Sequence, residues 1–392
     1  MLVKMKLETS TSFRAATKCF SIMSKSLGIN CNVPSYTTLL NWIHKIGYYK
    51  LHKIKEKADD WIIILDESIQ LGCDKVLVIL GIRESEIDFT RPINFQDLVP
   101  LREISKTKWT GELIKDEVLD LKNEIGNIKY AVADYGSDVK KGLGELNIPH
   151  IHDVTHKIAL ILEKAFKDNI YYKEITQQMS EMRSKFSQSE IAYIIPPKQR
   201  TKSRYQNIKI ISDWCIKALN LMENDQEKSK KITDSLKWIV SYKTFIRELS
   251  EINQVICDIE KILKYNGLSV LTKNQCSLIL SRLTSNLGIE ITEKIYTYLN
   301  STIEMLPDNE RILITSDIIE SAFGKYKNYV SCNPMAGITN LVLSIAAFTS
   351  SLDEGEIKKA LEVTSTDDLK KWSEQFIGKT LFQKRREALC PI

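Results

Sequence analysis

The first fifty residues place apolar side chains at the spacing of short helices. Residues 12–28 carry an apolar or small residue every three or four positions, and Gly28 is a candidate C-terminal cap. Ser35 is a candidate N-cap for a second helix, whose predicted stop is Gly47. The pattern therefore predicts two or three short helices at the start of the chain.

Beyond these helices the pattern changes to short β-rich runs. The runs are WIIILD (61–66), KVLVILGI (75–82), DLVPLREI (97–104), IKYAVAD (128–134) and PHIHD (149–153). Helical patterns over residues 110–124 and 138–146 separate the last three runs. Three strands followed by alternating helix and strand predict a mixed sheet covered by helices.

After His156 the chain is almost wholly helical until about residue 300, and RILITSD (311–317) then resembles a strand before a further helix. The uncharged stretch 328–352 contains too many polar residues for a membrane span and predicts a buried helix beginning near Pro334. The expected organisation is a head (1–58), a core (59–167 plus 301–352), an all-helical insertion (168–300) and a helical tail (353–392).

Charge and cysteine content narrow the class of protein. The net charge is +5, but residues 1–58 alone hold ten cations and two acids, so the head is basic and the remainder slightly acidic. A basic head on a near-neutral body is typical of a polyanion-binding module. The eight cysteines form no CxxC pair and no signal peptide is recognisable, so we expect a cytoplasmic protein without disulfides.

The two capped helices of the head fit a helix-turn-helix, whose second helix enters a DNA major groove. Tyr36, Thr37, Asn41 and Lys45 then face bases or phosphates. An ordinary helical hairpin fits the same pattern, and the head alone does not decide between them.

Two predicted strands end in an acid, and a third acid lies early in a predicted helix. Asp66 ends WIIILD and Asp134 ends IKYAVAD, where a rigid strand can aim its last side chain; Glu320 follows RILITSD. Three converging carboxylates suit two Mg²⁺ or Mn²⁺ ions, which prefer oxygen ligands. Two such ions can activate a water or 3′-hydroxyl and stabilise the leaving oxygen of a phosphodiester.

Glu320 and Lys327 are seven residues apart, about two helical turns, and therefore share a helix face. If this face is directed towards a phosphate, Lys327 and the nearby Lys325 bind DNA while Glu320 binds a metal ion. The alternative is a solvated helix face.

Residues 195–207 form a proline-led basic segment. Lys198, Arg200, Lys202 and Arg204 occupy alternate positions and point one way if the segment is extended. Such a stripe suits a phosphate backbone, although a solvated charge run is the usual alternative.

With these motifs the chain resembles DDE transposases of bacterial insertion sequences. The likeness rests on the head, Asp66 in LDES, Asp134 in ADYGSD and Glu320 in SDIIESAFGKYK. It implies a ribonuclease H-like core, a mixed five-stranded sheet flanked by helices and interrupted by an all-α insertion. It also implies that the three acids bind divalent metal ions.

Further expectations follow from this resemblance. Asp153 and His156 in HDVTH match family positions that shape the site or touch DNA, and a homodimer is expected because two element ends are synapsed. Glu320 and Lys327 match half of a longer signature, whose upstream Tyr and Arg positions hold Leu313 and Ser316 here. A nucleoid-associated location is implied as well.

The histidine-rich stretch has a second interpretation. His150 and His152 share a strand face, and with His156 they could form a zinc site, although no cysteine lies nearby.

Three functions fit the sequence. The first is an active transposase that cleaves double-stranded DNA at its element's ends and joins the 3′-ends to target DNA. The second is a catalytically silent DNA-binding protein derived from a transposase, and the third is a general nuclease on the same fold.

Overall fold

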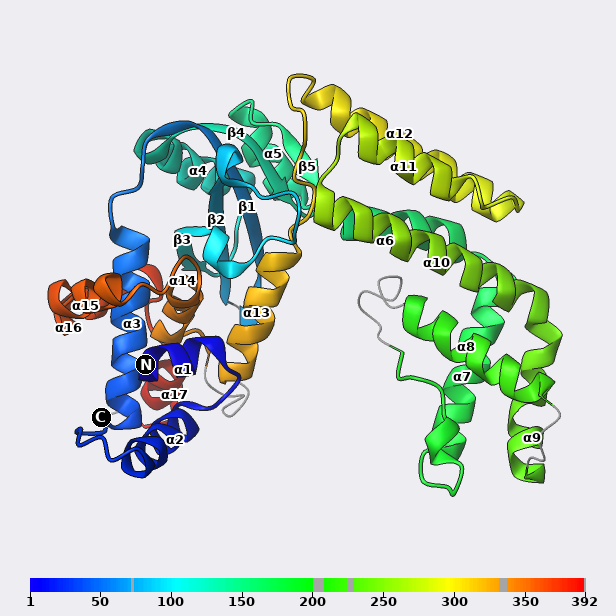
Figure 1. Cartoon of the computed structure of the whole chain (residues 1–392), viewed down its shortest axis with the longest axis horizontal. Helices are drawn as coiled ribbons and strands as arrows, with labels where there is room; N and C mark the ends of the chain where they lie inside the picture. The colour runs from blue at the N-terminus through cyan, green and yellow to red at the C-terminus, as the bar shows by residue number, and fades with distance from the viewer. Residues whose placement is uncertain (72–73, 200–207, 225–228, 331–336, 391–392) are drawn as a thin grey trace. The chain divides into compact units, whose positions relative to one another are not determined.

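The chain forms two compact units in the computed structural model (Figure 1). The model describes residues 1–71, 74–199, 208–224, 229–330 and 337–390. One unit comprises Met1–Ile151 and Ser316–Ile392, and the other comprises His152–Thr315. The predicted head and tail thus fall in the same unit as the sheet, and the helical insertion begins and ends outside the predicted bounds of 168–300.

The first unit is built on a five-stranded sheet in the order β3-β2-β1-β4-β5. β1 pairs antiparallel with β2, β2 pairs antiparallel with β3, and β1 pairs parallel with β4. The strands are β1 (Ala58–Leu71), β2 (Asp74–Arg83), β3 (Val99–Lys106), β4 (Gly126–Ala133) and β5 (His150–His152). This is the ribonuclease H-like arrangement that the sequence predicts.

The strands are apolar along their length because both faces of the sheet are covered. On one face, Ile63, Leu65 and Ala131 pack in a core with side chains of α4 (Gly111–Ile125) and α5 (Ser137–Glu145). The alternate residues of β1, such as Ile62 and Ile64, are also fully buried. A second helical layer must therefore cover the other face.

Helices from both ends of the chain provide that layer. α3 (Tyr36–His52) contacts β3 and α14 (Ser344–Phe348), and α13 (Asp317–Val330) contacts β1 and α14. The other helices of this unit are α1 (Leu2–Glu8), α2 (Phe13–Ser26), η1 (Glu84–Glu86), η2 (Phe95–Asp97), η6 (Asn340–Leu343), α15 (Glu354–Val363), α16 (Thr366–Phe376) and α17 (Leu381–Leu389). The tail is helical, as predicted.

The predicted stop at Gly47 is wrong, because α3 continues to His52. Gly47 is instead a position of close approach: a Cβ on this residue would lie 1.9 Å from the carbonyl oxygen of Leu343. The glycine lets α3 lie directly against the segment that leads into α14.

The second unit is helical. Its elements are α6 (Val154–Phe166), α7 (Ile170–Phe186), η3 (Ala192–Ile194), α8 (Ile208–Glu223), α9 (Lys230–Leu236), η5 (Lys237–Tyr242), α10 (Lys243–Asn266), α11 (Val270–Leu280) and α12 (Asn286–Met305). RILITSD, predicted as a strand, forms only an isolated antiparallel bridge between Ile312 and Leu268. The main-chain N–H of Val154 donates to the Ile314 carbonyl at 2.9 Å, so the first and last segments of this unit lie together.

The stretch 328–352 is not one helix. Residues 328–330 end α13, residues 337–352 contain the short helices η6 and α14, and the predicted start at Pro334 lies outside the described residues. Among the described residues, no helix is long and apolar enough to cross a membrane.

Candidate active site and nucleic-acid-facing residues

Asp66 and Asp134 each follow a residue of the last pair in the ladder between β1 and β4. Asp134 directly follows β4, whereas β1 continues past Asp66 to Leu71, so the predicted strand end at Asp66 is wrong. In the parallel ladder between β1 and β4, Leu65 lies opposite Ala133, so the two aspartates follow at the same level. Leu65 and Ala133 belong to the core under α4. Because side chains alternate along a strand, Asp66 is directed to the opposite face of the sheet. Both aspartates are half-buried.

Glu320 reaches this region from α13, the helix that contacts β1. The helix buries Ile319, Ala322, Phe323 and Tyr326 as one stripe, whereas Glu320 is exposed beside the stripe. No described residue of α13 belongs to the core under α4, so this helix covers the face to which Asp66 is directed. The fold therefore brings the elements of all three predicted acids to one side of the sheet.

The next question is whether these side chains lie close enough together to bind a metal ion. Within residues 1–71, 74–199, 208–224, 229–330 and 337–390, no group of three or more His, Cys, Asp and Glu side chains is placed to hold a metal ion. The donor set at this end of the sheet consists of carboxylate oxygens, which are the ligands that Mg²⁺ and Mn²⁺ prefer. The residue types fit such ions, and their convergence stays a prediction.

Two further acids near Asp66 lie beyond the sequence predictions. Glu67 follows Asp66 directly, and its carboxylate lies 3.7 Å from the Lys75 ammonium. Burial raises the pKa of Glu67, Lys75 lowers it, and Asp138 in the first turn of α5 raises it. The influence of Asp138 indicates that Glu67 is directed towards α5, which packs on the same face of the sheet as α4. The only sequence signal for this group is the LDES motif itself.

Lys327 and Lys325 have different surroundings although both lie on α13. Lys327 is exposed, as a phosphate-holding side chain requires. The Lys325 ammonium instead donates to the carbonyl of Leu7 and lies 4.5 Å from the centre of the Phe348 ring. Burial lowers the pKa of Lys325, and Glu8 partly offsets this effect. Lys325 thus joins α13 to α1, a role the sequence did not predict.

Of the residues in the head that were predicted to face DNA, some are exposed and one is half-buried. Tyr36, Thr37 and Asn41 are exposed on the first turns of α3, and the Arg14 guanidinium lies 4.7 Å from the centre of the Tyr36 ring. Lys45 is half-buried, with its ammonium 3.5 Å from the carbonyl of Leu361. Its position favours a contact between α3 and α15 over one with DNA, and the helix-turn-helix stays a prediction.

The basic segment of the insertion is described only at its start. Lys198 is exposed, and the neighbouring Gln199 donates through its side-chain amide to the Thr176 carbonyl at 2.6 Å. Arg200, Lys202 and Arg204 lie outside the described residues.

Asp153 and His156 begin α6 of the second unit. The buried Asp153 carboxylate accepts a hydrogen bond from the main-chain N–H of His156 at 2.9 Å and lies 3.1 Å from its ring Nδ1. The Tyr298 hydroxyl donates to the His152 carbonyl at 2.7 Å. Asp153 is therefore the N-cap of α6, a structural task that its spacing to His156 could have indicated.

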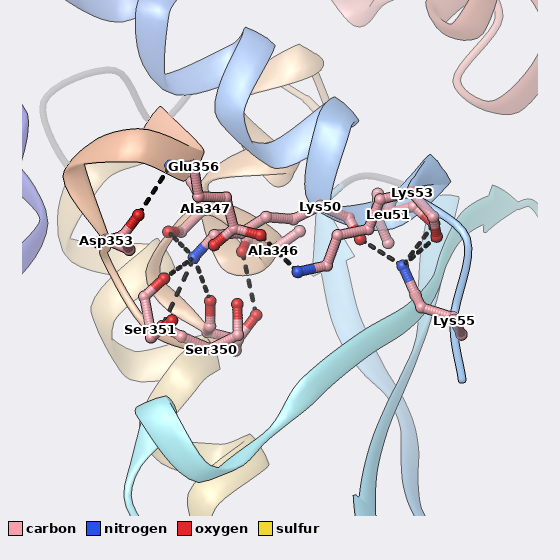
Figure 2. Close-up of polar contacts among 11 residues, drawn as sticks. Lys50, Leu51, Lys53, Lys55, Ala346, Ala347, Ser350, Ser351, Asp353 and Glu356 are labelled. Carbon is pink, nitrogen blue, oxygen red and sulfur yellow. Dashed lines mark hydrogen bonds and ion pairs between the residues drawn. The ribbon is translucent and has the colours of Figure 1, made fainter. Parts of the chain in front are cut away.

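Lys50 makes a set of buried contacts that the sequence did not predict (Figure 2). This lysine of α3 is fully buried, and its ammonium donates to the carbonyls of Thr349 at 2.6 Å, Ser351 at 3.0 Å and Ala347 at 3.3 Å. Burial lowers its pKa to about 8. Nearby, Lys53 pairs with Glu356. These contacts attach α3 to the segment between α14 and α15.

Comparisons with known proteins give a similarity among solved structures only. No protein-family model and no curated protein sequence matches the chain. Among solved structures, the Drosophila P element transposase strand transfer complex is similar, with 11% identity, a TM-score of 0.45 and coverage of 91% of this chain and 92% of that chain. At this identity and score the similarity does not identify the family of the chain.

Proposed function

We propose that this protein is a DNA transposase that cleaves the ends of its own mobile element and joins the 3′-ends to target DNA. One observation supports the proposal: Leu65 and Ala133, which precede Asp66 and Asp134, are paired in the parallel ladder, and α13, which carries Glu320, contacts β1. Carboxylates carried by a rigid sheet are well suited to bind the metal ions that assist phosphoryl transfer.

Asp66, Asp134 and Glu320 bind Mg²⁺ or Mn²⁺ in this proposal. Bound ions supply the activation of the attacking hydroxyl and the stabilisation of the leaving oxygen. The exposed Lys327 neutralises a phosphate of the bound strand, two turns along the helix from Glu320.

Other exposed groups extend the DNA contact. The DNA at the element end is contacted from α3 by Tyr36, Thr37 and Asn41. It is contacted from the insertion by Lys198, Arg200, Lys202 and Arg204. The protein acts as a homodimer, because two element ends must be held for one reaction. An insertion-sequence origin and a nucleoid-associated location belong to the same proposal.

Cleavage of DNA that flanks the gene tests the proposal. We expect nicking that requires Mg²⁺ or Mn²⁺ and falls about a hundredfold or more in Asp66→Asn, Asp134→Asn and Glu320→Gln. Asp116→Asn is the matched control, because Asp116 is an exposed acid on α4, the helix that covers the other face. Cleavage retained in all three site variants contradicts the proposal.

The remaining outcomes identify the alternative functions. End-specific binding without cleavage in any divalent metal indicates a silent DNA-binding protein. Cleavage without preference for particular ends indicates a general nuclease. Inverted terminal repeats bounded by a short target duplication around the gene support the transposase.

A further inference from the structure

β3 is an edge strand of the sheet, with β2 on one side only. Half of the main-chain N–H and C=O groups of such a strand point away from its partner. In the part of the chain that the structure describes, no main-chain hydrogen bond joins β3 to any segment other than β2. Pro100 within this strand is consistent with an edge position, where a missing N–H is tolerated.

A groove with a volume of about 1010 Å³ runs beside this edge, entirely within the first unit. Its lining residues come from β3, from α4, from α16, from the last two residues of α3 and from residues 53–55 and 57 after it. The sheet edge is therefore accessible along a groove with walls on both sides, rather than sealed by a helix as edges often are.

The two long walls of the groove carry opposite charge. On the α4 side lie Glu117, Asp120 and Glu124, and on the α3 side lie Lys53, Lys55 and Lys57. α4 covers the sheet face that holds Ile104, whereas α3 contributes no described residue to that core and lies on the other face. The groove thus combines acids from α4 with bases from the segment that follows α3.

Internal contacts engage four of these six side chains: Glu117, Glu124 and Lys53 form ion pairs, and Lys55 donates to main-chain carbonyls. Glu117 pairs with Lys106 at 3.1 Å, and Glu124 pairs with Arg102 at 2.5 Å. Lys53 pairs with Glu356, and the Lys55 ammonium caps the last carbonyls of α3. Asp120 and Lys57 are exposed, and no ion pair is recorded for either among the described residues.

Apolar side chains complete the groove. Ile54 is 97% exposed, more than any other large apolar residue of the described chain, and it stands at the rim. Trp372 and Phe376 of α16 line the groove, and Phe376 packs against the core under α4. An exposed isoleucine opposite aromatic side chains is typical of a surface that contacts protein.

We propose that the edge of β3 accepts an extended segment of a partner protein as an added strand. Because successive side chains of a strand point to opposite faces, the segment carries basic residues facing Asp120 and acidic residues facing Lys57. Apolar residues between them contact Ile54 and Phe376. Nucleic acid fits less well, because a groove lined by both Asp120 and Lys57 favours a partner that carries both signs of charge over one that carries phosphates alone.

A synthetic capped peptide of about ten residues tests this directly. One face of the extended peptide carries Glu and Val in turn, and the opposite face carries Lys and Val in turn. Fluorescence anisotropy follows the binding of the labelled peptide to the full chain. We expect saturable binding that is lost when every peptide amide is N-methylated, because the added strand is held by main-chain hydrogen bonds. This readout does not depend on DNA cleavage.

Reversing the charge of a groove residue tests whether the peptide binds in the groove. Asp120→Lys weakens binding about tenfold and a peptide with Glu in place of Lys restores it, whereas Asp116→Lys, on the same helix outside the groove, changes nothing. Absent binding, or binding that tolerates N-methylation, overturns the proposal. Displacement of the peptide by duplex DNA, or self-association abolished by Asp120→Lys, assigns the groove to nucleic acid or to a second copy and also overturns it.

Discussion

Lys50 illustrates, at the scale of one residue, how the start of the chain is attached to its end. Its buried ammonium donates to carbonyls that lie about three hundred residues away in sequence. Lys50→Met removes the donors and leaves these carbonyls unsatisfied, so we expect the free energy of unfolding to fall by about 3 kcal/mol in urea titrations. Lys53→Met removes a partly exposed pair and is expected to cost less than about 1 kcal/mol. Equal losses in the two variants contradict this account.

Glu103 gives a pH prediction at the same scale. This β3 residue is buried, and neither carboxylate oxygen has a hydrogen-bond partner among the described residues. Burial raises its pKa well above the ordinary 4.5. The native state therefore keeps a proton that the unfolded chain releases above pH 4.5, so stability contributed by the protonated form is lost as the pH rises from there towards the folded pKa.

The matched variant is Glu103→Gln, which resembles the protonated acid but does not titrate. We expect its stability relative to the natural chain to increase with pH by about 1.4 kcal/mol per pH unit across that window. Chemical denaturation at several pH values measures the difference. A constant difference from pH 5 to pH 8 shows that Glu103 does not hold the proton.

At the scale of elements, local sequence patterns located the strands and helices of the sheet well. β3, α4, β4, α5 and β5 each begin and end within about two residues of the predicted bounds, because apolar runs and caps are local signals. The end of α3 was missed because the stop signal of Gly47 is overridden by its packing against Leu343. RILITSD was wrongly predicted as a strand: its apolar residues Ile312, Leu313 and Ile314 are buried, but only Ile312 forms a β-bridge, with Leu268.

Gly47 and Gly144 provide a matched pair of helix glycines. Gly47→Ala places a methyl group against the Leu343 carbonyl, and we expect a loss of about 3 kcal/mol. Gly144→Ala in α5 meets nothing within 4 Å, and we expect a gain of about 0.5–1 kcal/mol from the reduced freedom of the unfolded chain. Thermal unfolding of both variants compares them. A neutral Gly47→Ala contradicts the close packing of α3.

The candidate site was predictable in part. An acid after an apolar run is visible in the sequence, which is why Asp66 and Asp134 were predicted. The pairing of Leu65 with Ala133 brings the two positions to one level, and their role in a site stays a prediction. The engagement of Lys325 with Leu7 was not visible, because the two residues are 318 positions apart. Such long-range contacts leave no local pattern.

At the scale of the whole molecule, the head is part of the sheet-containing unit. Leu39, Ile43 and Ile46 of α3 are buried, as is Lys50. A chain starting at residue 59 exposes the surfaces of β3 and α14 that α3 covers, so we expect it to lose cooperative thermal unfolding and to aggregate. Circular dichroism with a temperature ramp detects this. A stable 59–392 fragment that unfolds cooperatively would falsify the claim that the head is an integral part of this unit, and would indicate a separate head domain.

The most direct test of the central claim is a change of metal preference in DNA cleavage. Asp66→Cys and Asp134→Cys replace a carboxylate by a softer thiolate ligand at positions proposed to bind metal. The account predicts that both variants lose cleavage of the element ends in Mg²⁺ and recover part of it in Mn²⁺ or Cd²⁺, whereas Asp116→Cys behaves like the natural chain. Full activity of the two site variants in Mg²⁺, or loss that no thiophilic ion restores, contradicts metal binding by these aspartates.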